Sequence, residues 1–329
     1  YYMTVPAAEI HTAIDALGDA ITTSTLATAE FEKERGVILE EISRKEDSPY
    51  GFLFEKLYET AFASGPYHHS VLGETSTIAA MTRDMMWAYY KKHYVPGNML
   101  LVVAGDVDAQ SVLQASELAF ARSAASQPAS NEGMPPFQWR SGADVTIPRD
   151  VREAYVAVAF PAPGIMQPES VYAADLLQAI LSEGNAARLN RELKERLGLV
   201  SNIGASYPTH RHDSLFTIIA TLDPERVGEY RESLMKELDR ARDKKFDAAT
   251  IRRAKKLLTN SHYFSKETTG GAAAAFGYYF TLTGSPEFEA KYIESVAAVT
   301  DDQVRDAARQ IFDPQKAVWI TLTPSAQDF

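Results

Sequence analysis

Two glutamates of the segment EFEKERGVILEEI, residues 30–42, are candidates for chemistry because they stand seven residues apart. On a helix with about 100° per residue, Glu34 and Glu41 lie near 300° and 280° when Phe31 defines 0°. Both carboxylates therefore fall at the edge of the apolar stripe that Phe31 and Ile42 form. A carboxylate that faces a core is costly unless it is hydrogen-bonded, paired or bound to a metal.

An alternative needs no metal. Glu34 and Glu41 can turn outward and pair with the neighbouring Arg35 or Lys45, as exposed charges on a helix commonly do. The helix alone does not decide between a metal site and a solvated face, so the rest of the chain must be considered.

Composition limits the classes of function. The chain has 329 residues, a formal net charge of −11 and no cysteine. The acidic balance and the lack of a Lys/Arg cluster disfavour nucleic-acid binding. No apolar run is long enough for a membrane span. The lack of cysteine excludes disulfides, thiolate zinc sites and cysteine nucleophiles, but it does not fix the compartment.

A repeat at a fixed spacing organises the chain. The segment that begins at Thr82 matches the segment that begins at Thr300, 218 residues later, without a gap. Each copy predicts a Thr-capped helix, a Pro-containing turn and a strand around Leu100 or Val318. At the same spacing, YYMTVP matches the strand IIATLD, and Glu34 and Glu41 match Arg252 and Thr259. The carboxylates are therefore not required by the fold of the repeated unit.

The repeat predicts the domain organisation. We expect a first unit at 1–122, a polar linker at 123–140 and a second unit at 141–329. The second copy has a strand, a helix and a further strand before Ile219 for which the first copy has no counterpart. The first unit is thus expected to lack its N-terminal part, and the chain is expected to be part of a longer protein.

The sequence resembles the pitrilysin/insulinase-type (M16) zinc peptidases, which include the mitochondrial processing peptidase. The resemblance is carried in order by ERGVILEEI, PYHHSVLG, YYKKHYVPGNMLLVVAGDVD and LSEGNAARLNRELKERLGLV. It implies an α+β fold of two homologous units, each a mainly antiparallel sheet with helices on one face, similar to LuxS/MPP-type metallopeptidases. It also implies Zn2+ as the cofactor.

The resemblance assigns roles to both glutamates. In the family an H-x-x-E-H helix supplies two histidine ligands and a glutamate that activates water, and a later glutamate completes the zinc site. Glu41 stands where that third ligand is expected, and Glu34 stands where a supporting carboxylate is expected. No H-x-x-E-H occurs in these 329 residues. We therefore expect that motif upstream of Tyr1 and expect this chain to be inactive by itself.

The sequence also departs from the family pattern at two positions that are expected to bind the substrate. In such enzymes the second unit often carries an Arg and a Tyr seven residues apart, which hold the substrate. In this chain Lys194 and Ser201 occupy those positions, so the resemblance implies a metal-bearing subunit that needs an Arg/Tyr-bearing partner, or a homodimer. His68 and His69 are placed by the resemblance near the substrate cleft. Adjacent histidines rarely bind one ion, and a loop without a chemical role is the alternative.

The leading hypothesis is therefore a zinc-dependent endopeptidase, of the catalytic subunit type, that cleaves peptides or unfolded polypeptides. The alternative is a non-catalytic scaffold or substrate-binding subunit of the same fold, since fold does not guarantee activity. The sequence upstream of Tyr1 discriminates between them.

Overall fold

The computed structural model describes residues 1–121, 137–184 and 186–325. Its α-helices are α1 (Ile10–Thr22), α2 (Thr28–Asp47), α3 (Pro49–Ala61), α4 (Thr75–Ala80), α5 (Arg83–His93), α6 (Ala109–Phe120), α7 (Pro168–Ser182), α8 (Val227–Asp243), α9 (Ala248–Ser265), α10 (Thr269–Thr283), α11 (Glu287–Ala298) and α12 (Asp301–Ile311). The strands are β1 (Phe62–Ser64), β2 (Gln138–Trp139), β3 (Asp144–Arg149), β4 (Ala154–Ala162), β5 (Asn202–Ser206), β6 (Ser214–Leu222) and β7 (Val318–Pro324). Short helices of other types are η1 (Ala7–Glu9), η2 (Pro66–His68), η3 (Pro96–Asn98), η4 (Asn190–Arg196), η5 (Pro224–Arg226) and η6 (Pro314–Lys316).

The chain forms two compact units, and each unit combines segments from both halves of the sequence. Unit 1 comprises Tyr1–Ser43, Leu72–Gly133 and Tyr263–Thr281. Unit 2 comprises Arg44–Val71, Met134–His262 and Leu282–Phe329. Helix α3 therefore belongs to unit 2 although it comes early in the chain, and most of α10 belongs to unit 1 although it comes late.

A five-stranded sheet forms the centre of unit 2. Its strand order is β3-β7-β4-β6-β5, in which β3 and β7 are parallel and the other neighbours are antiparallel. Strand β4 lies between β7 and β6, and its Ala157 pairs with Ile219 on one side and Ile320 on the other. This mixed but mainly antiparallel sheet confirms the predicted α+β class.

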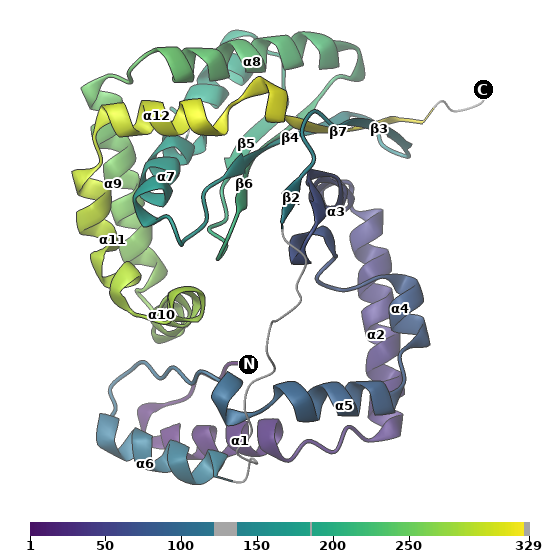
Figure 1. The fold of residues 1–329 in the computed structure, drawn as a ribbon, viewed down its shortest axis with the longest axis vertical. Coiled ribbons are helices and arrows are strands. Elements are labelled where there is room, and N and C mark those ends of the chain that lie inside the picture. The colour runs from purple at the N-terminus through teal and green to yellow at the C-terminus, as the bar shows by residue number, and fades with distance from the viewer. Residues whose placement is uncertain (122–136, 185, 326–329) are drawn as a thin grey trace. The chain divides into compact units, whose positions relative to one another are not determined.

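Helices of the second half of the sequence pack on this sheet, and helix α3, which comes from the first half, also packs on its strands β4 and β7 (Figure 1). Phe160 of β4 packs against Phe312 at the end of α12, with ring centroids 5.3 Å apart. On the opposite face, Ala157 of β4 belongs to a buried cluster with Leu53 and Leu57 of α3. The physical reason is the apolar run of β4, which has buried residues on both faces and so requires cover on both.

The order of elements recurs at the predicted spacing. Helices α1, α2, α3 and α5 of the first half correspond in order to α8, α9, α10 and α12 of the second half. Both predicted threonine caps are confirmed: the Thr82 side chain accepts a hydrogen bond from the Met85 amide, and that of Thr300 from the Gln303 amide. The proline turns are also confirmed, as η3 and η6.

The strands predicted for the first half are not formed in the described residues. Residues 1–6 and 99–104 are without hydrogen-bonded strand structure, although the repeat aligns them with β6 and β7. A strand is stable only when a neighbouring strand satisfies its backbone groups. The described part of unit 1 offers no such neighbour to either segment. Its helices α1 and α6 pack on each other (Figure 1).

The predicted linker 123–140 lies, up to residue 136, outside the described residues. Its last part contains β2, which pairs with β1 in an antiparallel two-stranded sheet. The predicted boundaries 1–122 and 141–329 concern copies in the sequence, whereas the compact units are defined by contacts. Those boundaries therefore stay a prediction.

Candidate functional site

Helix α2 carries the candidate metal ligand. Its charges favour this helix, since Glu30 lies in the first turn and Arg44 and Lys45 lie in the last, where each sign complements the helix dipole. Phe31 and Ile42 are the buried residues of the helix. They define the face that α2 buries, as the sequence predicted.

Glu34 and Glu41 lie on an exposed edge of α2, beside that buried face. Val37, which falls between them on the helix surface, is also exposed, with 41% of its surface accessible. Seven residues of helix place the two glutamates about 10 Å apart along the axis, on nearly the same side. Among the described residues, neither carboxylate has a hydrogen bond or ion pair.

The alternative pairing with Arg35 or Lys45 does not form. Arg35 donates to the backbone oxygen of Met81 at 2.9 Å and pairs with Glu32. Lys45 pairs with Glu55 of α3 at 3.2 Å. Both cations next to the candidate site are therefore engaged elsewhere, and α2 presents Glu34 and Glu41 without local neutralisation.

The described residues do not by themselves make a metal site. Within residues 1–121, 137–184 and 186–325, no three His, Asp or Glu side chains converge in a way that could hold a metal ion. A zinc site needs three or four protein ligands, so Glu41 can supply one oxygen ligand and no more. No catalytic step is therefore assigned to these residues alone.

His68 is held by the end of helix α3. Its Nδ1 lies 3.0 Å from the backbone oxygen of Glu59 and 2.8 Å from that of Phe62. Both partners are acceptors, so Nδ1 carries the proton and only Nε2 is available to another group. His69 is exposed, and its ring makes an edge contact with that of His68, with centroids 5.2 Å apart. This geometry gives His68 a structural role, and substrate contact by either histidine stays a prediction.

Lys194 and Ser201 lie near the start of β5, in unit 2. Lys194 belongs to η4 and is half-buried. The Ser201 hydroxyl lies 2.8 Å from Oε1 of Glu153 and 2.9 Å from the backbone oxygen of Thr221. The serine, which directly precedes β5, thus joins the start of that strand to β6 and to Glu153, and its short side chain does not extend beyond these partners.

Sequence reasoning missed a polar cluster inside unit 2. The Tyr292 hydroxyl donates to Oδ2 of Asp175 at 2.8 Å, and the Tyr292 ring stacks on that of His262, with centroids 5.2 Å apart. His262 Nε2 in turn lies 3.4 Å from Oε1 of Glu289, which is buried. Asp175 stands alone in the apolar stretch SVYAADLLQAILS, and that isolation is the signal that could have revealed it.

Burial raises the pKa of Asp175 to about 7, and the hydrogen bond from Tyr292 only partly offsets this. The folded state therefore binds this proton more tightly than the unfolded state. The stabilisation is complete below the usual aspartate pKa of about 4 and is lost as the pH rises through 7.

We expect Asp175→Asn to remove most of this pH dependence. The amide oxygen can still accept the Tyr292 hydrogen bond, but the side chain no longer ionises. At pH 8 the variant should be more stable than the unsubstituted protein by up to about 4 kcal/mol, and at pH 4 the two should be nearly equal. Chemical denaturation across this pH range measures the difference. Equal stability differences at pH 4 and pH 8 would contradict the assigned ionisation.

Two family models match the chain. Residues 80–258 match the model described as "Peptidase M16 inactive domain", and residues 1–75 match "Insulinase (Peptidase family M16)". The first match alone covers more than half of the chain. Both halves of the chain are thereby assigned to the family that the motifs resemble.

Related proteins agree with this assignment. The chain is 28% identical over 260 residues to an uncharacterized zinc protease of Rickettsia felis, a match that covers 79% of this chain and 62% of that protein. It is also 28% identical over 317 residues to one of Streptomyces coelicolor, covering 94% of this chain and 69% of the relative. The chain thus spans less than two thirds of the Rickettsia protein.

A solved structure shares the fold. The crystal structure of a protease from Helicobacter pylori superposes with a TM-score of 0.86 at 21% identity, covering 97% of this chain and 78% of that one. At this identity the match concerns the fold alone. Together with the two family models, it shows that the chain belongs to the insulinase-type M16 peptidase family.

Proposed function

We propose that this chain is the metal-bearing part of a zinc-dependent endopeptidase. The observation that carries the proposal is the exposed edge of α2, where Glu34 and Glu41 have no partner among the described residues. The neighbouring Arg35 and Lys45 are committed to other acidic groups. An unneutralised pair of carboxylates at the family's ligand position is suited to a cation that the rest of the enzyme helps to hold.

In this proposal Glu41 provides the third protein ligand of Zn2+, and two histidines come from an H-x-x-E-H segment outside the 329 residues. Glu34 lies one heptad before Glu41 and acts as the supporting carboxylate. Such outer groups orient a histidine ligand by accepting its second N–H. The chain alone would then be inactive, since one oxygen ligand does not hold the ion.

The proposed substrates are peptides or unfolded polypeptides, and the proposed partner is a second M16-type subunit that carries the Arg/Tyr pair. Lys194 and Ser201 support this, because neither matches the reach and hydrogen bonding of an arginine and a tyrosine. The recurrent order of helices supports an internal duplication. Among the described helices, none has the length and apolar character that a bilayer crossing requires.

The alternative proposal is a non-catalytic scaffold or substrate-binding subunit, and the match of residues 80–258 to the "inactive domain" model favours it for that part of the chain. The presence or absence of H-x-x-E-H in the longer protein separates the two functions. The direct experiment is the zinc content of the full-length protein compared with that of its Glu41→Gln variant. If the full-length protein binds no zinc, the proposal that it is a zinc-dependent enzyme is wrong.

A further inference from the structure

Strand β5 is an edge strand of the sheet in unit 2. Among the described strands its one neighbour is β6, with which it pairs antiparallel from Asn202 to Ser206. In such a pair, alternate residues direct their N–H and C=O groups toward the partner strand, and the residues between them direct these groups outward. An edge strand therefore presents backbone groups with which a further strand can pair.

The outward backbone groups of Ala205 are bonded to helix α7. The Ala205 amide donates to the Ser182 hydroxyl oxygen at 2.7 Å, and the Ala205 carbonyl oxygen accepts from the Gln178 side-chain amide at 2.9 Å. The same Gln178 amide also donates to Oε1 of Glu183 at 3.1 Å, which helps to orient it. A strand added beside β5 would need both groups of Ala205 for its own hydrogen bonds. We refer to Gln178 and Ser182 together as the edge cap.

The helix that carries the edge cap is fixed by the core of unit 2. Leu177 and Leu181 of α7 are fully buried, and α7 contacts β5 directly. Gln178 and Ser182 are four residues apart, so both project from the same side of the helix. The strand permits this close approach, since a Cβ atom at Gly204 would still lie 3.8 Å from the Ser182 hydroxyl oxygen. The two hydrogen bonds are therefore made between elements that the core holds in place.

The opposite edge of the sheet carries a proline. Strand β3 pairs in parallel with β7, and the carbonyl oxygens of Ala143 and Arg149 face β7. They accept hydrogen bonds from the amides of Trp319 and Ser325. Because the direction of the backbone groups alternates along a strand, Pro148 lies among the residues that face outward. Proline has no N–H to offer to a further strand and is confined to such edge positions within sheets. Each edge thus lacks a free donor that an added strand would use.

We propose that the edge cap closes the β5 edge of unit 2 to strand addition, so that this sheet does not bind extended polypeptide. Peptides can bind to an exposed sheet edge as an additional strand, and main-chain hydrogen bonds then supply the affinity. At Ala205 these bonds are already made within the unit. The excluded partner is an extended segment of unfolded polypeptide, and this choice of partner rests on the proposed function. The closure itself depends on neither zinc nor peptidase activity.

Amide hydrogen exchange of the full-length protein, followed at single residues, tests the bond to Ser182. The Ala205 amide should exchange at least about 10-fold faster in Ser182→Ala than in the unsubstituted protein, because its acceptor is lost. The matched variant Ser182→Thr keeps the hydroxyl oxygen and should leave this rate unchanged. Equal exchange of Ala205 in Ser182→Ala and in the unsubstituted protein contradicts the edge cap.

Removal of both side chains should open the edge. The double variant Gln178→Met, Ser182→Ala of the full-length protein keeps the bulk of both residues but neither hydrogen bond. It should bind a fluorescein-labelled peptide of about ten alternating valine and threonine residues, the length of a long strand. The affinity should exceed that of the unsubstituted protein by at least about 10-fold, the effect of two main-chain hydrogen bonds. Fluorescence anisotropy measures the affinity.

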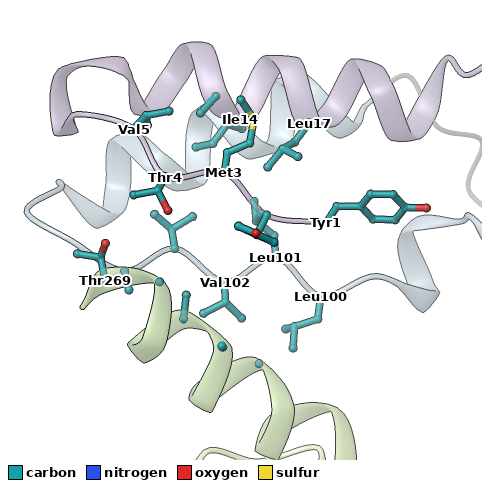
Figure 2. Close-up of a pocket in the computed structure, with 18 of the residues that line it drawn as sticks. Tyr1, Met3, Thr4, Val5, Ile14, Leu17, Leu100, Leu101, Val102 and Thr269 are labelled. Carbon is teal, nitrogen blue, oxygen red and sulfur yellow. The ribbon is translucent and has the colours of Figure 1, made fainter. Parts of the chain in front are cut away.

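Exchange at residues 202–206 must localise this binding. Unit 1 contains a cavity of about 690 Å³ lined by apolar residues such as Leu100 and Leu101 (Figure 2), so a total affinity alone does not identify β5. Peptide bound at β5 slows exchange at 202–206 in the double variant. Addition of Ala205→Pro removes the outward N–H and should abolish the gain.

Self-association of the double variant supports the proposal equally, if it slows exchange at 202–206 and is reversed by Ala205→Pro, because a second copy then supplies the strand. A folded double variant that gains neither peptide binding nor self-association overturns the proposal. Peptide that slows exchange at 202–206 in the unsubstituted protein also overturns it, and this measurement needs no variant to fold. Neither readout uses zinc or activity, so the edge cap can be confirmed in a protein that fails the proposed function.

Discussion

Replacing Glu41 by glutamine in the full-length protein is expected to weaken zinc binding by at least about 100-fold, because in the proposed site one of three protein ligands loses its charge. Glutamine keeps the size and helix propensity of glutamate, so helix α2 should remain intact. Glu41 is exposed and without an ion pair among the described residues, so its replacement removes no contact that the fold uses. Atomic absorption after dialysis against a weak chelator measures the retained metal.

Two variants on the same helix make this result specific. Glu40→Gln changes the charge equally at an exposed residue that lies opposite the buried face of α2, about 100° around the helix from Glu41, and it should retain the full zinc content. Glu34→Gln should weaken binding by about 10–100-fold, as the loss of an outer carboxylate commonly does. Full zinc occupancy in Glu41→Gln would contradict its role as a ligand. Equal loss in Glu40→Gln would point to a general effect of charge.

The sequence predicted the helices and turns well because these depend on local signals. The caps at Thr82 and Thr300 and the turns at Pro96 and Pro314 each involve side chains within a few residues, and all four are present. The prediction of strands at residues 1–6 and 99–104 was wrong, and the reason is physical. Their apolar pattern is that of strands, but the described part of unit 1 offers neither segment a neighbouring strand to pair with.

Which sheet a helix covers could not be predicted. The pattern of α3 shows an apolar face formed by Leu53 and Leu57, but the same pattern fits a sheet from either half of the chain. The structure places this face on β4 and β7, about 100 to 270 residues later in the sequence. The helix wheel did locate Glu34 and Glu41 beside the buried face. It could not show that Arg35 and Lys45 are engaged by Glu32 and Glu55.

The full-length form of the proposed metal-bearing subunit, purified alone and assayed on an unfolded polypeptide, is expected to be at least about 100-fold less active than when it is mixed with the proposed Arg/Tyr-bearing partner. The loss of one donor to a developing negative charge commonly costs this much. A lysine at position 194 keeps the charge but lacks the planar fork of arginine. Ser201 lies against Glu153 and Thr221, so its hydroxyl is already engaged at 2.8 and 2.9 Å.

A gain-of-function variant separates a missing clamp from other causes of low activity. Lys194→Arg combined with Ser201→Tyr restores both side chains of the family pair and should raise the activity of the isolated subunit, through kcat more than KM. The control is Ser201→Ala, which removes the same bonds to Glu153 and Thr221 without adding a phenol, and which should not raise activity. Full activity of the unsubstituted subunit alone would refute the division of labour. Lys194 and Ser201 would then be tolerated substitutions in a homodimer, whose clamp must come from other residues.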